Sequence, residues 1–354
     1  MDIFKDMVVD YHDKLDKRRL AILCDLVKFR ALTTNQIRDK YFGGKGNNVN
    51  NVLSRLRKSG YIKTGSVKGS REGKKGYPYH TITESGIEIL FANGKEFEYE
   101  PRKPHFQEFQ VRYIVQTNDI LLYLEEEGWQ SLNSRDVKFK YNLDKRSNIL
   151  GELTSPDKEN YAVYVFERNT DVRTIGRIQS EIVTQASSIP NAIIFTKGKN
   201  SFNKFVELGL KKGLHTGGKV KLIPSHLGVP IFSAFPKELD WVRELGKHIN
   251  FEVVSTEKEG GSAKQSFPYL IRHNGEEKYF VDMSFTDLSQ LHKLEAYARS
   301  NYRWEKKRVL VSYMLGNSID LMSKQVSSIT DTEQLSYDSF LEMVNGFQFD
   351  SDMF

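Results

Sequence analysis

Three short segments with the apolar spacing of helices, broken by a glycine-rich turn, constrain the fold of this chain more than any other feature. Apolar residues recur at helical intervals over residues 14–30, which predicts an amphipathic first helix. A second, short helix is expected over 36–41, and the glycines within 43–46 form a turn. A third helix is expected over 47–59, where Gly60 ends it. This order is typical of a helix-turn-helix.

A hairpin is predicted directly after the third helix. Residues 61–63 and 79–82 have strand-forming side chains, and the loop 65–76 between them is rich in Gly, Lys and Arg. A helix-turn-helix followed by a basic hairpin commonly places its last helix in the major groove of DNA and the hairpin on the flanking backbone. A further helix is expected over 87–92. Residues 1–98 are therefore predicted to form a winged helix-turn-helix domain.

The positive charge of the chain is concentrated in the same segment. The full chain of 354 residues carries a formal net charge of +6, and residues 1–98 hold 19 Lys and Arg against 12 Asp and Glu, a net of +7. The remaining 256 residues therefore sum to −1. A basic region on a folded domain is typical of contact with phosphate groups. Double-stranded DNA is the predicted partner.

The polar face of the third helix and the basic loop supply the predicted DNA-binding side chains. An Asn amide can bond to adenine, and an Arg guanidinium to guanine, in the major groove. For any single residue of the helix, an ordinary solvated face is an equally good interpretation. The predicted DNA-binding residues are Asn47, Asn48, Asn51, Ser54, Arg55 and Lys58 in the helix and Lys68, Arg71, Lys74 and Lys75 in the loop.

Composition excludes several other classes of protein. No stretch approaches the roughly 18 apolar residues that a membrane helix needs, so no membrane partner is expected and the cytoplasm is the predicted location. The single cysteine excludes a disulfide scaffold and a cysteine-based zinc site. A connector over residues 95–104, with the linker itself at 99–104, follows the first domain, and its two prolines, Pro101 and Pro104, break any helix. We place a domain boundary there.

After the connector, a strand-helix-strand order occurs twice, in predicted domains at 105–235 and 236–354. Such connections imply parallel strands joined by a right-handed crossover, within a mixed sheet. The predicted fold class is therefore α+β multidomain, and similar strand-helix-strand order in the two units suggests a degenerate duplication, with coincidence as the alternative. The elements expected are a helix over 105–127, strands over 137–141, 149–153 and 161–166, a helix over 173–188 and a strand over 191–196, then a strand over 278–284, a helix over 288–303 and a strand over 308–313.

Two acids in the first α/β unit form a candidate metal site. Asp157 follows Pro156 at the turn into the strand 161–166, and Glu167 lies at the end of that strand, ten residues later. Carboxylates on adjacent strands, a few ångströms apart, can hold Mg²⁺, and Glu152 or Glu108 could add a ligand. Acids at strand ends are, however, usually solvated. Both interpretations remain open on pattern alone.

The chain resembles the replication-relaxation family of winged-helix proteins from bacterial plasmids and integrative elements. The resemblance rests on the combination TTNQI…NVLSRLRKSGYI…YPYHTITESGIEIL with the later PD…YVFERNT segment, and it covers roughly residues 15–200. It implies a central domain similar to the PD-(D/E)xK restriction-endonuclease fold, and some related proteins, the MobC-type relaxases, are thought to nick transfer-origin DNA with a divalent metal. By this resemblance Asp157 and Glu167 match the two acids, and Mg²⁺ or Mn²⁺ is the implied cofactor.

The sequence departs from that nuclease pattern at Asn169. Active nucleases usually have Lys or another acid there, and a neutral amide cannot supply the charge that helps to activate water. Lys158, Arg168, Lys197 or Lys199 are candidates to replace it. The second α/β unit, residues 236–354, has Asp282 at the end of its first strand but no matching acid ten residues upstream. We therefore interpret that unit as a non-catalytic surface for packing, dimerisation or holding DNA.

Two functions follow from these observations. The first is a relaxase-like DNA-binding protein of plasmid or mobile-element replication or mobilisation, whose nuclease-like region nicks or holds DNA. Its candidate catalytic residues are Asp157, Glu167 and Asn169. The second is a non-catalytic transcription regulator or replication initiator whose α/β units dimerise or bind a partner. A homodimer is expected in either case, with other plasmid replication or transfer proteins as further candidate partners.

Overall fold

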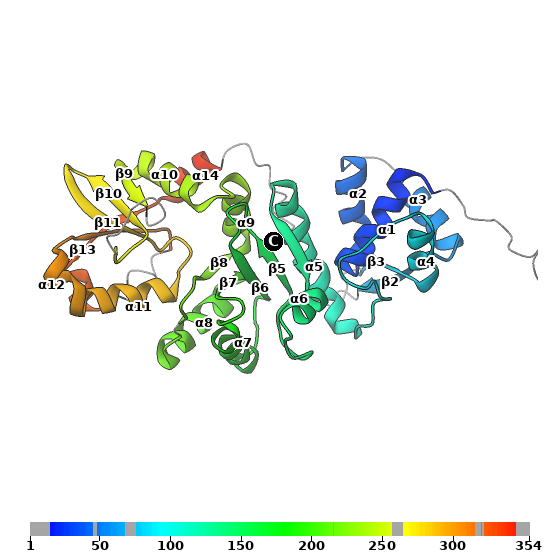
Figure 1. The fold of residues 1–354 in the computed structure, drawn as a ribbon, viewed down its shortest axis with the longest axis horizontal. Helices are drawn as coiled ribbons and strands as arrows, with labels where there is room; N and C mark the ends of the chain where they lie inside the picture. The colour runs from blue at the N-terminus through cyan, green and yellow to red at the C-terminus, as the bar shows by residue number, and fades with distance from the viewer. Residues whose placement is uncertain are drawn as a thin grey trace, which may run out of the picture. The chain divides into compact units, whose positions relative to one another are not determined.

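A computed structural model describes residues 15–44, 48–67, 76–214, 216–256, 265–315, 320 and 322–344. The chain divides into two compact units, Met1–Leu122 and Tyr123–Phe354, which are described separately (Figure 1). The described residues form three sheets, one within each of the predicted segments 1–98, 105–235 and 236–354. The domain limits themselves stay predictions. Within these described ranges, no helix is both long and apolar enough to cross a bilayer.

The first unit contains the predicted helix, turn, helix and hairpin. A two-residue strand between the first two helices, which the sequence did not indicate, joins the hairpin in an antiparallel sheet of order β1-β3-β2. The elements are α1 (Lys17–Phe29), β1 (Leu32–Thr33), α2 (Thr34–Phe42), α3 (Asn48–Lys58), β2 (Ile62–Val67), β3 (Tyr77–Ile82) and α4 (Glu84–Ala92).

A capping box fixes the start of α2. The Gln36 amide N–H donates to Thr33 Oγ1 at 3.1 Å, and the Thr33 amide donates to Gln36 Oε1 at 2.8 Å. Gln36 also donates through Nε2 to the carbonyl oxygen of Val115 at 2.8 Å, in α5 (Glu108–Glu126). Asn118 of α5 donates to the carbonyl oxygens of Phe29 and Ala31 at 3.0 and 2.6 Å. Residues 115 and 118 of α5 are thereby tied to α2 and to the chain at the end of α1.

The second unit begins with a five-stranded mixed sheet of order β4-β5-β6-β7-β8. β4, β5 and β6 pair antiparallel, and β6, β7 and β8 pair parallel. Buried apolar side chains of β6 and β7 pack against Ile175, Ile178 and Ile182 of α7, which makes this sheet face part of the core. The elements are β4 (Gln130–Asn133), α6 (Ser134–Lys140), β5 (Gly151–Thr154), β6 (Asn160–Phe166), α7 (Val172–Gln185), β7 (Asn191–Thr196), α8 (Lys199–Lys212), β8 (Val220–Pro224) and α9 (Ser225–Ala234).

A second five-stranded sheet follows in the same unit, again with its strands in chain order from one edge to the other. Its first three strands pair antiparallel and its last three pair parallel, as in the first sheet. The similarity of the two α/β segments therefore extends to strand order and direction. The elements are α10 (Glu238–Ile249), β9 (Phe251–Thr256), β10 (Tyr269–His273), β11 (Glu276–Asp282), α11 (Leu288–Ala296), a π-helical turn η1 (Tyr297–Asn301), α12 (Tyr302–Glu305), β12 (Val309–Tyr313), α13 (Lys324–Ser327), β13 (Thr330–Gln334) and α14 (Tyr337–Met343).

One predicted strand is wrong, because residues 137–141 lie in α6 and its C-cap. The alternation of apolar and lysine residues there suggested a strand. The Asn133 side chain instead accepts from the amides of Arg135 and Asp136, at 2.8 and 3.2 Å, and so caps a helix. Val137 is then fully buried while Phe139 is 77% exposed, which a single helix face explains.

Candidate nucleic-acid interface

The third helix, α3, is held to the first unit by its apolar face. Val49, Leu53 and Leu56 are buried, with exposed fractions of 5% or less. Full burial of each such side chain contributes about 1.5–3 kcal/mol. Because these residues lie three and four positions apart, the opposite face of the helix is left to solvent.

That opposite face carries the predicted DNA-binding residues of the helix. Asn48, Asn51, Arg55 and Lys58 are exposed, and Ser54 is partly exposed. Residues 51, 54, 55 and 58 are spaced three, four and seven apart, so they form one stripe along the helix. The predicted residues Asn47, Lys68, Arg71, Lys74 and Lys75 lie outside the described residues.

Positive charge on this surface extends beyond the predicted residues. Arg57 at the end of α3 and Lys63 in β2 are also exposed. The helix α3 contains no acid, and none of Arg55, Arg57, Lys58 and Lys63 forms an ion pair with another described residue. Both additional cations belong to the basic segment of residues 1–98, and their place in or next to the third predicted helix was the sequence feature that could have identified them.

A buried histidine holds the hairpin against the helices. His80 of β3 is 4% exposed, and its ring nitrogens are hydrogen-bonded to Thr34 Oγ1 of α2 and Thr64 Oγ1 of β2, each at 3.0 Å. Burial, with the nearby positive charge of Arg57, lowers the pKa of His80 to about 4. The ring is therefore neutral near pH 7, and it links α2 to both strands of the hairpin, one of which, β2, carries the exposed Lys63.

The structure does not bring the predicted metal ligands together. Asp157 precedes β6 and Glu167 follows it, so the two lie at opposite ends of a strand of 7 residues. At about 3.3 Å per residue the strand spans about 20 Å. The expectation that these carboxylates lie a few ångströms apart is wrong, because a residue at the turn into a strand cannot approach one at the strand's far end.

The other candidates around that site take structural places. Glu152 of β5 is 1% exposed and pairs with Lys140 Nζ of α6 at 2.7 Å. Asn169 is exposed and accepts from Asn200 Nδ2 at 3.1 Å. Lys158 lies in the turn with Asp157, while Arg168 follows the other end of β6. Lys197 follows β7 and donates its amide to the carbonyl oxygen of Phe166 at that end of β6, at 2.9 Å, and Lys199 begins α8. The side chain of Glu108 lies outside the part of the chain that the structure describes. Among the described residues, no group of three or more Asp, Glu, His or Cys side chains is arranged to hold a metal ion.

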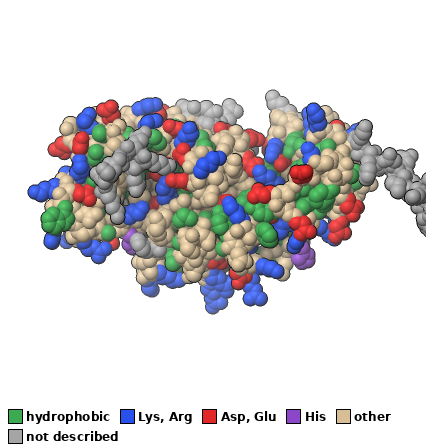
Figure 2. All heavy atoms as spheres, in the orientation of Figure 1, with side chains coloured by type: hydrophobic (Ala, Val, Ile, Leu, Met, Phe, Trp, Pro, Cys, Tyr) green, Lys and Arg blue, Asp and Glu red, His purple; other side chains and the backbone are tan. Residues whose placement is uncertain are grey.

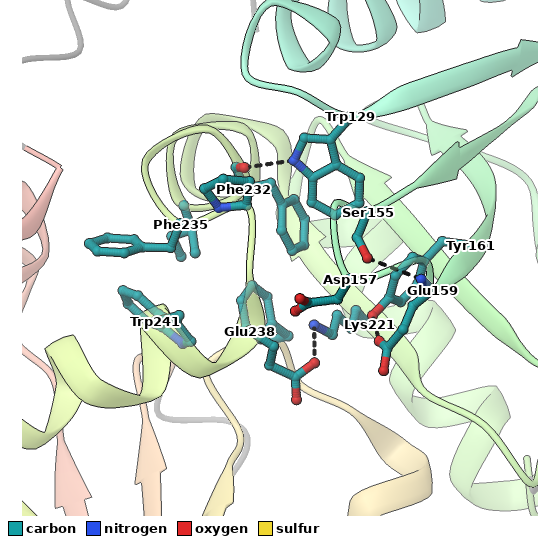
Figure 3. Close-up of a pocket in the computed structure, with 13 residues that line it drawn as sticks. Trp129, Ser155, Asp157, Glu159, Tyr161, Lys221, Phe232, Phe235, Glu238 and Trp241 are labelled. Carbon is teal, nitrogen blue, oxygen red and sulfur yellow. Dashed lines mark hydrogen bonds and ion pairs between the residues drawn. The ribbon is translucent and has the colours of Figure 1, made fainter. Parts of the chain in front are cut away.

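Asp157 instead lines an aromatic pocket in the second unit (Figure 3). Lys221 of β8 extends between Glu238 of α10 and Asp157, and its Nζ lies 4.6 Å from the centre of the Phe285 ring. Phe285 in turn stacks on Phe232, with ring centres 5.2 Å apart. The pocket is lined by Trp129, Ser155, Asp157, Glu159, Tyr161, Lys221, Ile231, Phe232, Phe235, Pro236, Glu238, Trp241 and Phe285.

Ion pairs beside this pocket join three elements. Lys219 Nζ lies 2.8 Å from both Glu159 and Glu238, and Lys221 Nζ lies 3.3 Å from Glu238. Burial opposes charge on Glu238, but Lys221 and Lys219 outweigh it and lower its pKa to about 2. Burial likewise disfavours the charged form of Lys219, yet Glu238 and Glu159 raise its pKa to about 12. These charges compensate one another, which favours a structural role.

The carboxylate of Asp282 is also hydrogen-bonded to other groups of the protein. It accepts from Trp241 Nε1 at 2.7 Å, from Ser312 Oγ at 3.0 Å and from the amide of Ser284 at 2.8 Å. Burial raises the pKa of Asp282. A carboxylate held by three donors from α10, β12 and its own turn joins elements, which is compatible with the non-catalytic interpretation of the second α/β segment.

Comparisons with known proteins do not identify a family for this chain. No family model matches the sequence, and no curated protein matches it. One similar solved structure is the crystal structure of Bacillus subtilis PadR in complex with operator DNA, which is 16% identical, with 37% of this chain and 83% of that chain covered at a TM-score of 0.19.

Proposed function

We propose that this protein binds a specific site in double-stranded DNA through α3 and the β2–β3 hairpin. The observation that carries the proposal is the acid-free exposed stripe on α3, in which Asn51, Arg55 and Lys58 lie opposite a fully packed apolar face. A helix anchored in this way can enter the major groove without losing its own packing. The hairpin, fixed by His80, places Lys63 beside it.

Different side chains of this surface have different roles in the proposal. Asn51 and Arg55 have the donors and acceptors to read adenine and guanine edges. Lys58 and Lys63 present point charges suited to phosphate oxygens, which fix the position of the protein but carry no sequence information. Specificity therefore resides in α3, and salt-dependent affinity is shared with the hairpin.

The proposed biological setting is replication or mobilisation of a plasmid or mobile element, in line with the replication-relaxation resemblance. The helix, three antiparallel strands, crossover helix and parallel strand in each α/β segment support a restriction-endonuclease-like arrangement. The separation of Asp157 from Glu167 removes that pair as a nicking site. We therefore assign the α/β segments a non-catalytic role in dimerisation or partner binding. A homodimer would present two α3 helices to half-sites about one DNA turn apart.

Fluorescence anisotropy with a duplex selected from random sequence tests the binding proposal. Arg55→Ala should weaken binding to the selected duplex by about 1–3 kcal/mol and relax preference at one base position. Lys58→Ala should weaken selected and random duplexes alike and reduce the salt slope by about 1. Arg146→Ala, which removes an exposed arginine from a loop of the second unit, is the matched control.

The proposal fails if Arg55→Ala and Lys58→Ala both bind the selected duplex as tightly as Arg146→Ala does. A separate arm examines nicking, with supercoiled plasmid that carries the selected site incubated with Mg²⁺ or Mn²⁺. Asp157→Ala and Glu167→Ala should relax the plasmid no differently from the unaltered chain, because the two carboxylates cannot share one ion.

A further inference from the structure

One tryptophan of the second unit is almost fully exposed. Trp129 and Trp241 are 5% and 1% exposed, whereas Trp304 of α12 is 86% exposed. An indole buries a large apolar area when it is covered, so an exposed one offers a large, rigid ring face to a partner. Trp304 lies in α12, the short helix that directly follows the π-helical turn η1, a type of distortion that is frequent at functional sites.

The packing around α12 turns this tryptophan outward. Tyr297 is buried in the core of the second sheet, and Tyr302 packs on it with ring centres 6.1 Å apart. Glu305 also faces inward, where its two carboxylate oxygens accept from Ser266 Oγ and Tyr279 OH, each at 2.6 Å. Residues 302 and 305, three apart, thus hold one side of the helical turn to the protein. Trp304 is left on the other side.

Two cations flank the exposed ring. Arg303 and Lys306 are exposed, and neither forms an ion pair with another described residue. The next cations along the chain are engaged, since Lys307 pairs with Glu277 at 2.8 Å and Arg308 pairs with Asp331 at 2.7 Å. Figure 2 shows basic side chains near a hydrophobic one on the part of the second unit's surface where α12 lies. Glu305, the acid of α12, is turned inward, so the exposed charges of this short helix and its C-cap are the cations Arg303 and Lys306.

We propose that Trp304, Arg303 and Lys306 form a binding site for single-stranded nucleic acid. The indole stacks on one unpaired base, and the two cations contact the phosphates on either side of it. A flat exposed ring between positive charges is the arrangement that single-strand binding uses. In a duplex the base faces are covered by neighbouring bases, so the ring has no face to stack on.

The isolation of the ring favours a nucleic acid over a protein partner. Between residues 288 and 315, Trp304 is the sole exposed large apolar side chain. A protein partner is typically held by a larger patch with an apolar centre, whereas one aromatic ring per base suffices for stacking. The site is independent of α3, so it can be tested whether or not the duplex proposal holds.

Intrinsic fluorescence of the full-length chain gives a direct test. Because the other two tryptophans are buried, quenching on addition of a short oligothymidylate reports on Trp304. Anisotropy of the labelled oligomer measures affinity in parallel. Trp304→Ala should lose the quenching and weaken binding about 5- to 150-fold, the equivalent of about 1–3 kcal/mol per stacked base. Trp304→Phe should keep most of the affinity, because a phenyl ring still stacks.

The cations are tested by a double variant with a matched control. Arg303→Ala/Lys306→Ala should reduce the log–log salt dependence of binding by about 1.4, which corresponds to two single-strand phosphate contacts. Lys145→Ala/Arg146→Ala removes two exposed cations from another loop and should leave the salt dependence unchanged. Oligouridylate in place of oligothymidylate distinguishes RNA from DNA as the source of the bases.

Several results would overturn this site. These are the absence of quenching by oligothymidylate, equal affinity of Trp304→Ala and the unaltered chain, quenching by anionic lipid vesicles alone, and conversion of a dimer to a monomer by Trp304→Ala in light scattering. Arg55→Ala/Lys58→Ala should keep the quenching, and Trp304→Ala should keep its affinity for the selected duplex. Failure of one proposal is thereby distinguished from failure of the other.

Discussion

At the scale of single residues, His80 makes the first unit sensitive to acid. The pKa of His80 is about 4 in the folded chain, below the ordinary value of 6.5 that applies when the chain is unfolded. Between these values the unfolded state takes up a proton that the folded state refuses. The free energy of unfolding is therefore fully retained above about pH 6.5 and falls as the pH decreases toward 4.

The expected loss between pH 7 and pH 5 is about 2 kcal/mol. Hydrogen-exchange protection of residues 77–82, corrected for intrinsic rates, measures it in the first unit. His80→Gln cannot titrate in this range, so its protection should change much less between the two pH values. An equal loss of protection in both proteins would assign the acid sensitivity to other groups.

At the scale of elements, the hairpin depends on a close approach between its strands. Gly65 of β2 lies directly opposite Tyr79 of β3, and a Cβ at residue 65 would meet the Tyr79 ring at 2.3 Å. Gly65→Ala should displace that ring and destabilise the hairpin by about 1–3 kcal/mol. The salt-dependent part of the affinity for the selected duplex should fall as the hairpin is destabilised, because Lys63 lies in the same strand as Gly65.

Urea unfolding followed by circular dichroism, together with anisotropy on the selected duplex, measures both effects. Ser66→Ala alters the neighbouring exposed position and should change neither. In a Tyr79→Ala background, Gly65→Ala should lower the free energy of unfolding only slightly further, because the ring that would clash is absent. A full additional cost in that background would contradict the contact as the cause.

Elements with one dominant pattern were predictable from the sequence. The strand at residues 191–196 is predicted to the residue, because an unbroken apolar run has few other ways to be buried. The helix α6 was not predictable in this way, since alternating apolar and charged residues fit a strand until the Asn133 cap decides for a helix. The polar stripe of α3 follows from periodicity alone.

The relative positions of the candidate metal ligands, Asp157 and Glu167, were predicted wrongly from the sequence. The turn before β6 was expected, and Lys158 there has a φ of 66° with its amide donating to the carbonyl oxygen of Ser155 at 2.8 Å. Because the turn lies at residue 157 and the strand ends at residue 166, Asp157 and Glu167 must lie at opposite ends of the same strand. Spacing along the chain does not reveal which partner strand would bring another group near. The Lys219, Glu159 and Glu238 cluster depends on pairing across 60 and 19 residues, which no local pattern contains.

At the scale of the whole molecule, the two sheets of the second unit share buried contacts and should unfold together. The amide of Leu222 in β8 donates to the carbonyl oxygen of Phe285 at 2.8 Å, and Leu288 of α11 packs into the core of the first sheet. Glu238 of α10 pairs with two lysines of the region around β8. Removing its carboxylate leaves both ammonium groups with less compensation in a partly buried site.

Glu238→Ala should therefore destabilise the second unit by about 1.5–3 kcal/mol. The rate of amide hydrogen exchange should rise both in β6 of the first sheet and in β11 of the second, because the ion pairs of Glu238 connect the two sheets. Glu244→Ala removes an acid of the same helix that pairs with the exposed Lys247 of that helix, so it should have a much smaller effect. Faster exchange in β11 with unchanged exchange in β6 would mean that the two sheets unfold independently. In that case the ion pairs around Lys219 would stabilise α10 locally, and the second unit would behave as two separate folding units.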